Sequence, residues 1–238
     1  MKRKIFDSGS SSSKENMSID ARLLHSLEGT KILLHLYSWK HLLPVTCGYF
    51  VNPEDVFISK AFSLIDLAKR PTGGGVVFHD ADFAFSLLVS ASHPLFSENV
   101  LDNYRVVNTL VVKSIQRAFG LSGDLSMQGS GESRKNMNFC MAKISRYDVI
   151  FQGQKIGGAA QRTTSRGFLH QGTVFLSGRC REFYQALLKE DVLDFIWGRV
   201  QESSFYFLGN DKQGSLLEEA RRSLRDAFIY EFCHWDDF

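Results

Sequence analysis

The sequence predicts an α/β (α+β) fold, with a mixed, mainly antiparallel sheet flanked by helices. Short segments of strand character are separated by tight turns, which favours strands joined by hairpins. Segments with helical spacing of apolar residues lie between and after these strands. Neither an internal repeat nor a linker-like stretch divides the 238 residues. We therefore expect one domain over residues 1–238, without an accessory C-terminal domain.

Local patterns justify each element. Met17, Leu24 and Leu27 recur at helical spacing, and Gly29 ends that helix. Pro53 is suited to open a helix, and Gln152-Gly153 is suited to a hairpin turn. The expected order is strand 4–7, a flexible Ser/Gly loop 8–13, helix 16–28, strands 31–37 and 45–51, helix 53–69, strands 76–79 and 83–90, helix 102–119, a polar loop 121–136, hairpin 147–156, strand 172–177, and helices 181–199 and 215–231.

Composition excludes several classes of protein. Hydrophobic content of 44% and charged content of 23% are typical of a soluble globular protein. A net charge of +2 is too small for a general nucleic-acid binder. No apolar run approaches the ~18–20 residues of a membrane span, and the basic start MKRKIFDSG lacks the apolar region of a signal peptide. We expect a cytoplasmic protein without nucleic-acid or membrane partners.

The four cysteines, Cys47, Cys140, Cys180 and Cys233, lie far apart without a C-x-x-C pair or accompanying histidine spacing. The sequence therefore indicates neither a disulfide framework nor a metal site.

The segment 140–173 points most directly to chemistry. Cys140 and Lys155 are fifteen positions apart, and Lys155 is followed after one residue by Gly157, Gly158 and Ala159. Acyl transfer needs a nucleophile, a cation that lowers its pKa, and backbone N–H donors for an oxyanion. A solvated lysine is the usual alternative, so this spacing needs support from the rest of the chain.

A second landmark is Arg70-Pro-Thr-Gly-Gly-Gly-Val-Val-Phe-His-Asp80. Its glycines, Gly73, Gly74 and Gly75, precede a strand and match neither the P-loop nor the dinucleotide fingerprint. Such a segment can lie flat against a ligand, or simply form a tight start to the strand. Arg70 is suited to hold a phosphate or carboxylate. His79-Asp80 and His170 suggest acid–base chemistry, although a structural role is at least as common for such residues.

These segments together resemble the lipoate–protein ligase and octanoyltransferase family, which shares its catalytic fold with biotin–protein ligases. Asn16–Ala21 is similar to the family's first helix, and Arg70–Asp80 to its glycine-rich acyl-binding segment. Asp148-Val-Ile-Phe-Gln-Gly-Gln-Lys155 is similar to the D-x-x-x-x-G-x-K motif with the essential lysine. The match covers nearly the whole chain, and the adenylate loop of biotin ligases is absent.

The resemblance implies protein lipoylation: attachment of an octanoyl or lipoyl group, by an amide bond, to one lysine of a lipoyl domain. The implied acceptors are 2-oxoacid dehydrogenases and the glycine cleavage H protein. Transferases take octanoate from acyl carrier protein through a cysteine thioester and need no cofactor. Ligases use ATP and Mg²⁺ and form lipoyl-AMP from lipoate. A binder of lipoyl domains or acyl chains without activity is a third possibility, but it would need neither Cys140 nor Lys155.

Three details favour the transferases. Cys140 falls where one transferase subgroup has its nucleophile, Asp82 resembles an acidic residue of that group, and Tyr147 replaces the asparagine of the ligases. Gly73–Gly75 and His170–Thr173 are also compatible with the ligases. The implied catalytic residues are Cys140 and Lys155, and the implied acyl- or adenylate-binding residues are Arg70, Gly73, Gly74, Gly75, His79, Asp148, Gly157, Gly158, Ala159 and His170.

Overall fold

A five-stranded sheet forms the centre of the computed structural model, which describes residues 2–121, 125–127 and 148–235. The strand order is β1-β2-β6-β11-β10. Only β1 and β2 are parallel, while the other neighbouring pairs are antiparallel. The fold class predicted from the sequence is therefore confirmed. The strands are β1 (Lys2–Ser11), β2 (Lys31–Trp39), β6 (Asp82–Ser90), β10 (Gly157–Thr164) and β11 (Gly167–Phe175).

Two smaller sheets lie beside the central one. The first has the order β4-β3-β5, and the second has the order β7-β8-β9. The turn between β8 and β9 is the expected one, because Gln152 and Gly153 have φ angles of 50° and 78°, as a type I′ hairpin turn requires. The strands are β3 (Pro44–Cys47), β4 (Asp66–Lys69), β5 (Val76–Phe78), β7 (Leu125–Met127), β8 (Val149–Phe151) and β9 (Gln154–Lys155).

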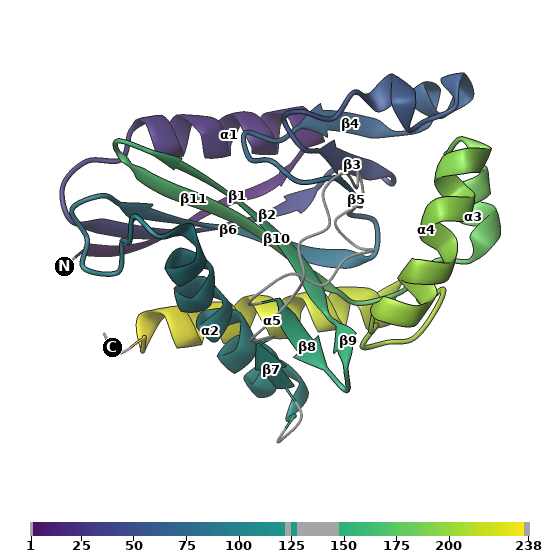
Figure 1. The fold of residues 1–238 in the computed structure, drawn as a ribbon. Coiled ribbons are helices and arrows are strands. Elements are labelled where there is room, and N and C mark those ends of the chain that lie inside the picture. Colours follow the sequence, from purple (N-terminus) through teal and green to yellow (C-terminus); the bar gives the residue numbers. More distant parts are fainter. Residues whose placement is uncertain (1, 122–124, 128–147, 236–238) are drawn as a thin grey trace.

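Helices cover both faces of the central sheet (Figure 1). Helix α1 (Ser13–His25) lies on one face, and α2 (Val100–Phe119) and α5 (Ser215–Cys233) lie on the other. Two further helices, α3 (Arg181–Gln185) and α4 (Glu190–Ser203), pack beside the β4-β3-β5 sheet. None of the helices in the described ranges is both long enough and apolar enough to cross a membrane.

Strand β6 shows why two layers of helices are needed, because all nine of its residues are buried. Phe83, Phe85 and Leu87 belong to the main core together with residues of α2 and α5. The intervening Ala84 packs with Met17 of α1, and Ser86 donates a hydrogen bond to Asp20 of α1. Alternation along one strand thus gives an apolar face under α2 and α5 and a partly polar face under α1.

Several expected elements were wrong. The serine-rich segment 8–13 is strand as far as Ser11, because pairing of an edge strand uses backbone groups that any residue supplies. The helix expected at 53–69 is replaced by two 3-10 turns (Pro53–Asp55, Ser59–Ser63) and β4. The helix expected at 181–199 is divided into α3 and α4. Strand β7 lies inside the expected polar loop, and β10 was not expected.

Candidate functional site

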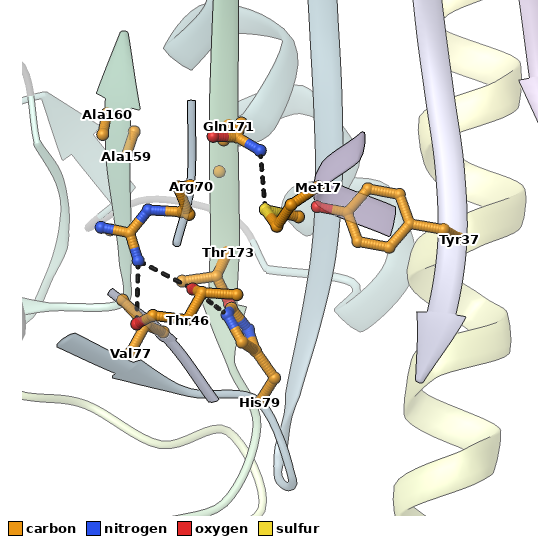
Figure 2. A pocket seen from close by; sticks show the side chains of 12 residues that line it. Met17, Tyr37, Thr46, Arg70, Val77, His79, Ala159, Ala160, Gln171 and Thr173 are labelled. Atoms are coloured by element: carbon orange, nitrogen blue, oxygen red, sulfur yellow. Dashed lines mark hydrogen bonds between the residues drawn. The ribbon is translucent and has the colours of Figure 1, made fainter. Parts of the chain in front are cut away.

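A narrow cavity lies between the central sheet and the β4-β3-β5 sheet (Figure 2). It encloses about 380 Å³ of empty space, its open mouth included. Figure 2 shows Ala159 and Ala160 on one side of it and Met17 and Tyr37 on the other. The remaining lining residues come from both sheets and their loops: Thr46, Arg70, Val77, His79, Gly158, Gln171, Gly172 and Thr173.

Arg70 fixes the glycine-rich loop from within. Its Nη1 donates to the carbonyl oxygen and Oγ1 of Thr46, at 3.1 and 2.7 Å. Its Nη2 donates to the carbonyl oxygens of Gly73 and Gly75, at 3.0 and 2.8 Å. These contacts hold the loop against β3, where a Cβ at Gly48 would overlap the backbone of Gly74. Arg70 therefore shapes the cavity wall, and its expected contact with a ligand stays a prediction.

His79 lies in the cavity wall, but Asp80 is not its partner. Its Nδ1 lies 2.7 Å from Oδ2 of Asp82, and its Nε2 lies 2.8 Å from Oγ1 of Thr46. Because a carboxylate only accepts, Nδ1–H of the ring donates to Asp82, and the Thr46 hydroxyl bonds the other ring nitrogen. The acid–base pair that the adjacent positions 79 and 80 suggested is therefore not formed.

The neighbouring carboxyl group of Asp80 pairs instead with Arg179, at 2.5 Å. Burial raises the pKa of Asp80 above its ordinary value, and the guanidinium opposes part of that shift.

A buried polar network supports the opposite side of the cavity. Nε2 of Gln171 donates to Oδ2 of Asp20 at 2.6 Å, and its Oε1 accepts from Oγ1 of Thr72 at 2.7 Å. Oδ1 of Asp20 lies 2.7 Å from Nδ1 of His35, and Ser86 donates to Oδ2 at 2.6 Å. Sequence reasoning missed this network. The available signal was an aspartate at position 20, three residues after Met17, in the apolar stripe of the first helix.

The lining polar side chains are thus bonded to one another or to the chain behind them. Thr173 completes the set through a close contact between its Oγ1 and Asp82. Polar groups that already have partners offer few unfilled hydrogen bonds, so the surface that they leave to a ligand is mainly carbon. Such a cavity suits an alkyl chain better than a charged or strongly polar ligand.

Lys155 and Asp148 meet at the base of the β8–β9 hairpin. The Nζ atom of Lys155 donates to Oδ2 of Asp148 at 2.8 Å, and the two side chains are only 4% and 9% exposed. A buried ammonium group needs such a partner to offset the loss of its hydration. The D-x-x-x-x-G-x-K spacing therefore encodes this contact: the turn reverses the chain and returns the lysine to the aspartate.

A second cavity, of about 290 Å³ with the open solvent at its mouth included, lies on the α2 face of the β10–β11 pair and is lined partly by Asp148, Gly157 and His170. Gly158 and Ala159 line both cavities, so only this ladder separates them. Gly157 is needed for close packing, because a Cβ there would overlap the carbonyl of Thr173.

His170 is fully buried, and burial lowers its pKa to about 3. Its Nδ1 accepts from Gln161 at 2.8 Å, while its Nε2 has no partner among the described residues. It is therefore neutral over the ordinary pH range, and its role towards an acyl group stays a prediction.

The expected nucleophile, Cys140, lies outside the described residues. Of the described cysteines, Cys47 is buried, and burial raises the pKa of its thiol, which disfavours a thiolate. Cys180 and Cys233 are exposed and line neither cavity. Within the described ranges, no group of three or more His, Cys, Asp or Glu side chains is arranged to hold a metal ion.

A family model described as the lipoyl protein ligase A/B catalytic domain matches residues 12–194. The chain therefore belongs to this family, as its glycine-rich segment and lysine motif led us to expect. The matched span includes both cavities and the Lys155–Asp148 pair, and it ends before α5.

The similar proteins are named either as octanoyltransferases or as lipoate–protein ligases. The octanoyltransferase LipM of Bacillus subtilis is 30% identical over 182 residues, which are 73% of this chain and 65% of the relative. The chain thus spans slightly less than two thirds of that protein. LipM of Macrococcus caseolyticus is 27% identical over 91% of this chain and 80% of its own length.

Among solved structures, a bipartite lipoate protein ligase from Thermoplasma acidophilum is 25% identical, with a TM-score of 0.67 over 98% of this chain and 83% of that chain. A lipoate-protein ligase A bound with ATP has a TM-score of 0.58 at 21% identity, over 98% of this chain and 95% of that one, and this likeness concerns the fold.

Proposed function

We propose that this protein transfers an octanoyl group from an acyl carrier protein to a lysine of a lipoyl domain, through a thioester on Cys140. The observation that carries the proposal is the cavity whose polar lining groups are already bonded within the chain, which leaves a slot for an alkyl tail. Membership of the family and similarity to proteins named octanoyltransferase support the same chemistry.

In the first step, the Cys140 thiolate attacks the carbonyl carbon of the carrier's thioester. A new carbon–sulfur bond forms, the bond to the carrier's sulfur breaks, and the carrier leaves as a thiolate that takes up a proton. Lys155 supplies the cation that stabilises both the attacking thiolate and the tetrahedral oxyanion. Asp148 keeps that ammonium group in place from behind, at 2.8 Å.

In the second step, the neutral amine of the acceptor lysine attacks the same carbonyl carbon. The amide bond forms, the bond to Cys140 breaks, and the amine proton is passed to the departing sulfur or to solvent. During both steps the alkyl tail lies against the face of the β10–β11 ladder formed by Gly158–Ala160 and Gln171–Thr173, with Met17 and Tyr37 on its other side (Figure 2). The acceptors are lipoyl domains of 2-oxoacid dehydrogenases and of the glycine cleavage H protein.

An ATP-dependent lipoate–protein ligase is the second candidate, favoured by the similarity to the Thermoplasma acidophilum ligase. That reaction would need ATP and Mg²⁺ near Lys155. Arg70, which lines the cavity, donates to Thr46, Gly73 and Gly75 of the chain itself. The described walls therefore fit an alkyl tail better than a triphosphate.

Two variants test the proposal. Cys140→Ala should abolish octanoyl transfer from acyl carrier protein to a lipoyl domain, because no thioester can form. Lys155→Ala should reduce the rate by at least ~10²–10³-fold, the usual cost of one oxyanion donor. Transfer is followed by the mass of the lipoyl domain.

Three outcomes separate the candidates. Full transfer by Cys140→Ala with ATP and lipoate would establish the ligase. Full turnover by Lys155→Ala would contradict both enzymatic candidates. Absence of any acyl transfer by the wild-type protein would leave a binder.

A further inference from the structure

The turn between β5 and β6, residues 79–82, is held by a side chain from α5. Nε of Arg221 donates to the carbonyl oxygen of Asp82 at 2.9 Å. Its Nη2 donates to the carbonyl oxygen of Asp80 at 2.9 Å and has a longer contact of 3.5 Å with that of His79. One guanidinium group thus reaches three of the four carbonyls of the turn.

The fourth carbonyl, that of Ala81, points elsewhere. It accepts from the backbone N–H groups of Leu176 and Ser177, at 3.2 and 3.0 Å. The turn is therefore fixed on one side by the chain after β11 and on the other by Arg221. Removal of the arginine leaves three carbonyls to find water or to move, since partly buried carbonyls are rarely left without a partner.

The same turn positions two side chains of the cavity wall. His79 reaches back to Thr46, and Asp82 accepts from His79 and Thr173. The His79 ring also stacks on Trp39, with ring centroids 4.4 Å apart. A displacement of the turn would therefore move the imidazole ring relative to the cavity and weaken the Asp82 contact with β11.

We propose that Arg221 is a positioning residue for acyl transfer: it holds the 79–82 turn and thereby fixes the His79 wall of the acyl cavity. This inference rests on the proposed function. It extends the residues that support acyl transfer to α5, which lies beyond the matched residues 12–194. Glu218 orients the guanidinium from the preceding helical turn, because its Oε1 accepts from Nη1 at 2.7 Å.

Geometry explains why the position carries arginine. The contacts with Asp82, Asp80 and Glu218 leave from three different nitrogens of one planar group. A lysine ammonium is a single point donor and cannot span the same set of acceptors. Arg221→Lys should therefore restore only part of what Arg221→Ala loses.

The matched control is the neighbouring Arg222. It is exposed, and it lines the same groove of about 1540 Å³ beside the turn as Arg221 does. No hydrogen bond or ion pair joins it to residues 79–82 within the described part of the chain. Arg222→Ala therefore removes one positive charge from the groove without releasing the turn.

The test compares Arg221→Ala, Arg221→Lys and Arg222→Ala in octanoyl transfer, with hexanoyl and decanoyl donors measured in parallel. Rates are expressed per folded molecule. We expect kcat/KM of Arg221→Ala to fall about 10²-fold, the scale of a 1 Å misplacement, and its preference for one chain length to weaken. Arg221→Lys should lie between Arg221→Ala and the wild type, and Arg222→Ala should match the wild type.

A second readout does not depend on turnover. The side-chain NMR signals of His79, assigned by their loss in His79→Gln, should shift in Arg221→Ala and stay in place in Arg222→Ala. Unchanged His79 signals, or an unchanged rate and chain-length profile in Arg221→Ala, would overturn the inference. If the wild-type protein transfers no acyl group, the proposed function fails, and the His79 signals still decide whether Arg221 holds the turn.

Discussion

Two histidine–aspartate pairs in this protein have the same geometry and different surroundings. In each, Nδ1 of the histidine lies 2.7 Å from an aspartate oxygen: His35 with Asp20, and His79 with Asp82. The first pair is fully buried under α1, and neither of the two cavities is lined by His35. The second lies in the wall of the proposed acyl cavity through His79.

The difference shows that a familiar atom pattern does not define a site. Oγ of Ser8 lies 2.9 Å from Nε2 of His35, so Ser8, His35 and Asp20 follow the atom order of a serine hydrolase triad. Neither Ser8 nor His35 lines either cavity or the groove beside the 79–82 turn, and Asp20 is also bonded to Ser86 and Gln171. We interpret the Asp20 pair as structural support and the Asp82 pair as part of the proposed acyl site.

The largest effect should come from the fully buried pair. Asp20→Ala leaves His35, Ser86 and Gln171 without their common acceptor, so the free energy of unfolding should fall by about 3–5 kcal/mol. Ser8→Ala removes a single hydrogen bond at the sheet edge and should cost only about 1 kcal/mol. Urea unfolding measures both, and equal losses in the two variants would contradict the structural interpretation.

The His79–Asp82 pair should affect the rate of octanoyl transfer more than the stability of the fold. In Asp82→Asn, the oxygen that His79 and Thr173 share becomes that of a neutral amide, which accepts more weakly than a carboxylate, and the second oxygen is replaced by a buried NH2 group without an acceptor among the described residues. Octanoyl transfer should fall about 10²-fold through misplacement of the cavity wall, with a stability loss of about 1–3 kcal/mol. His35→Phe is the control: it should lower stability but leave turnover per folded molecule near that of the wild type. If Asp82→Asn lost mainly stability and His35→Phe lost mainly turnover, the two pairs would not have the different roles that we assign to them.

A third buried histidine sharpens the comparison, because His170 has no carboxylate beside its ring in the described structure. Its folded pKa of about 3 lies below the ordinary value of 6.5. Between these pH values the unfolded chain binds a proton that the folded chain does not bind. Stability should therefore fall as pH drops from 6.5 towards 3, by up to about 1.4 kcal/mol per pH unit, and be independent of this group above 6.5.

His170→Gln provides the measurement for that prediction. Between pH 6.5 and pH 4.5, the free energy of unfolding of the variant, measured in urea, should fall less than that of the wild type. Parallel losses would mean that His170 is already protonated in the folded protein or that its environment is more polar than its burial indicates.

Local signals in the sequence accounted for the elements whose geometry is local. The Gln152-Gly153 turn and the spacing of Asp148 and Lys155 lie within eight residues, so turn chemistry alone was enough to bring them together. The partners of His79 could not be found in this way. Choosing Asp82 over Asp80 depends on which carboxyl group Arg179 takes, and that contact spans 99 positions.

Contacts with distant parts of the chain also outweighed the local preference for a helix. The 53–69 segment starts like a helix at Pro53 but ends as β4, because residues 66–69 pair with β3. The contact of Arg221 with the 79–82 turn spans 139 positions and leaves no local pattern in the sequence.

We propose that an acyl group passes through a thioester on this chain. Intact mass of the full protein, recorded after mixing with octanoyl acyl carrier protein in the absence of ATP, tests it most directly. We expect a gain of one octanoyl group that hydroxylamine removes and that Cys140→Ala does not acquire. An unchanged mass, together with ATP consumption in the presence of lipoate, would contradict it.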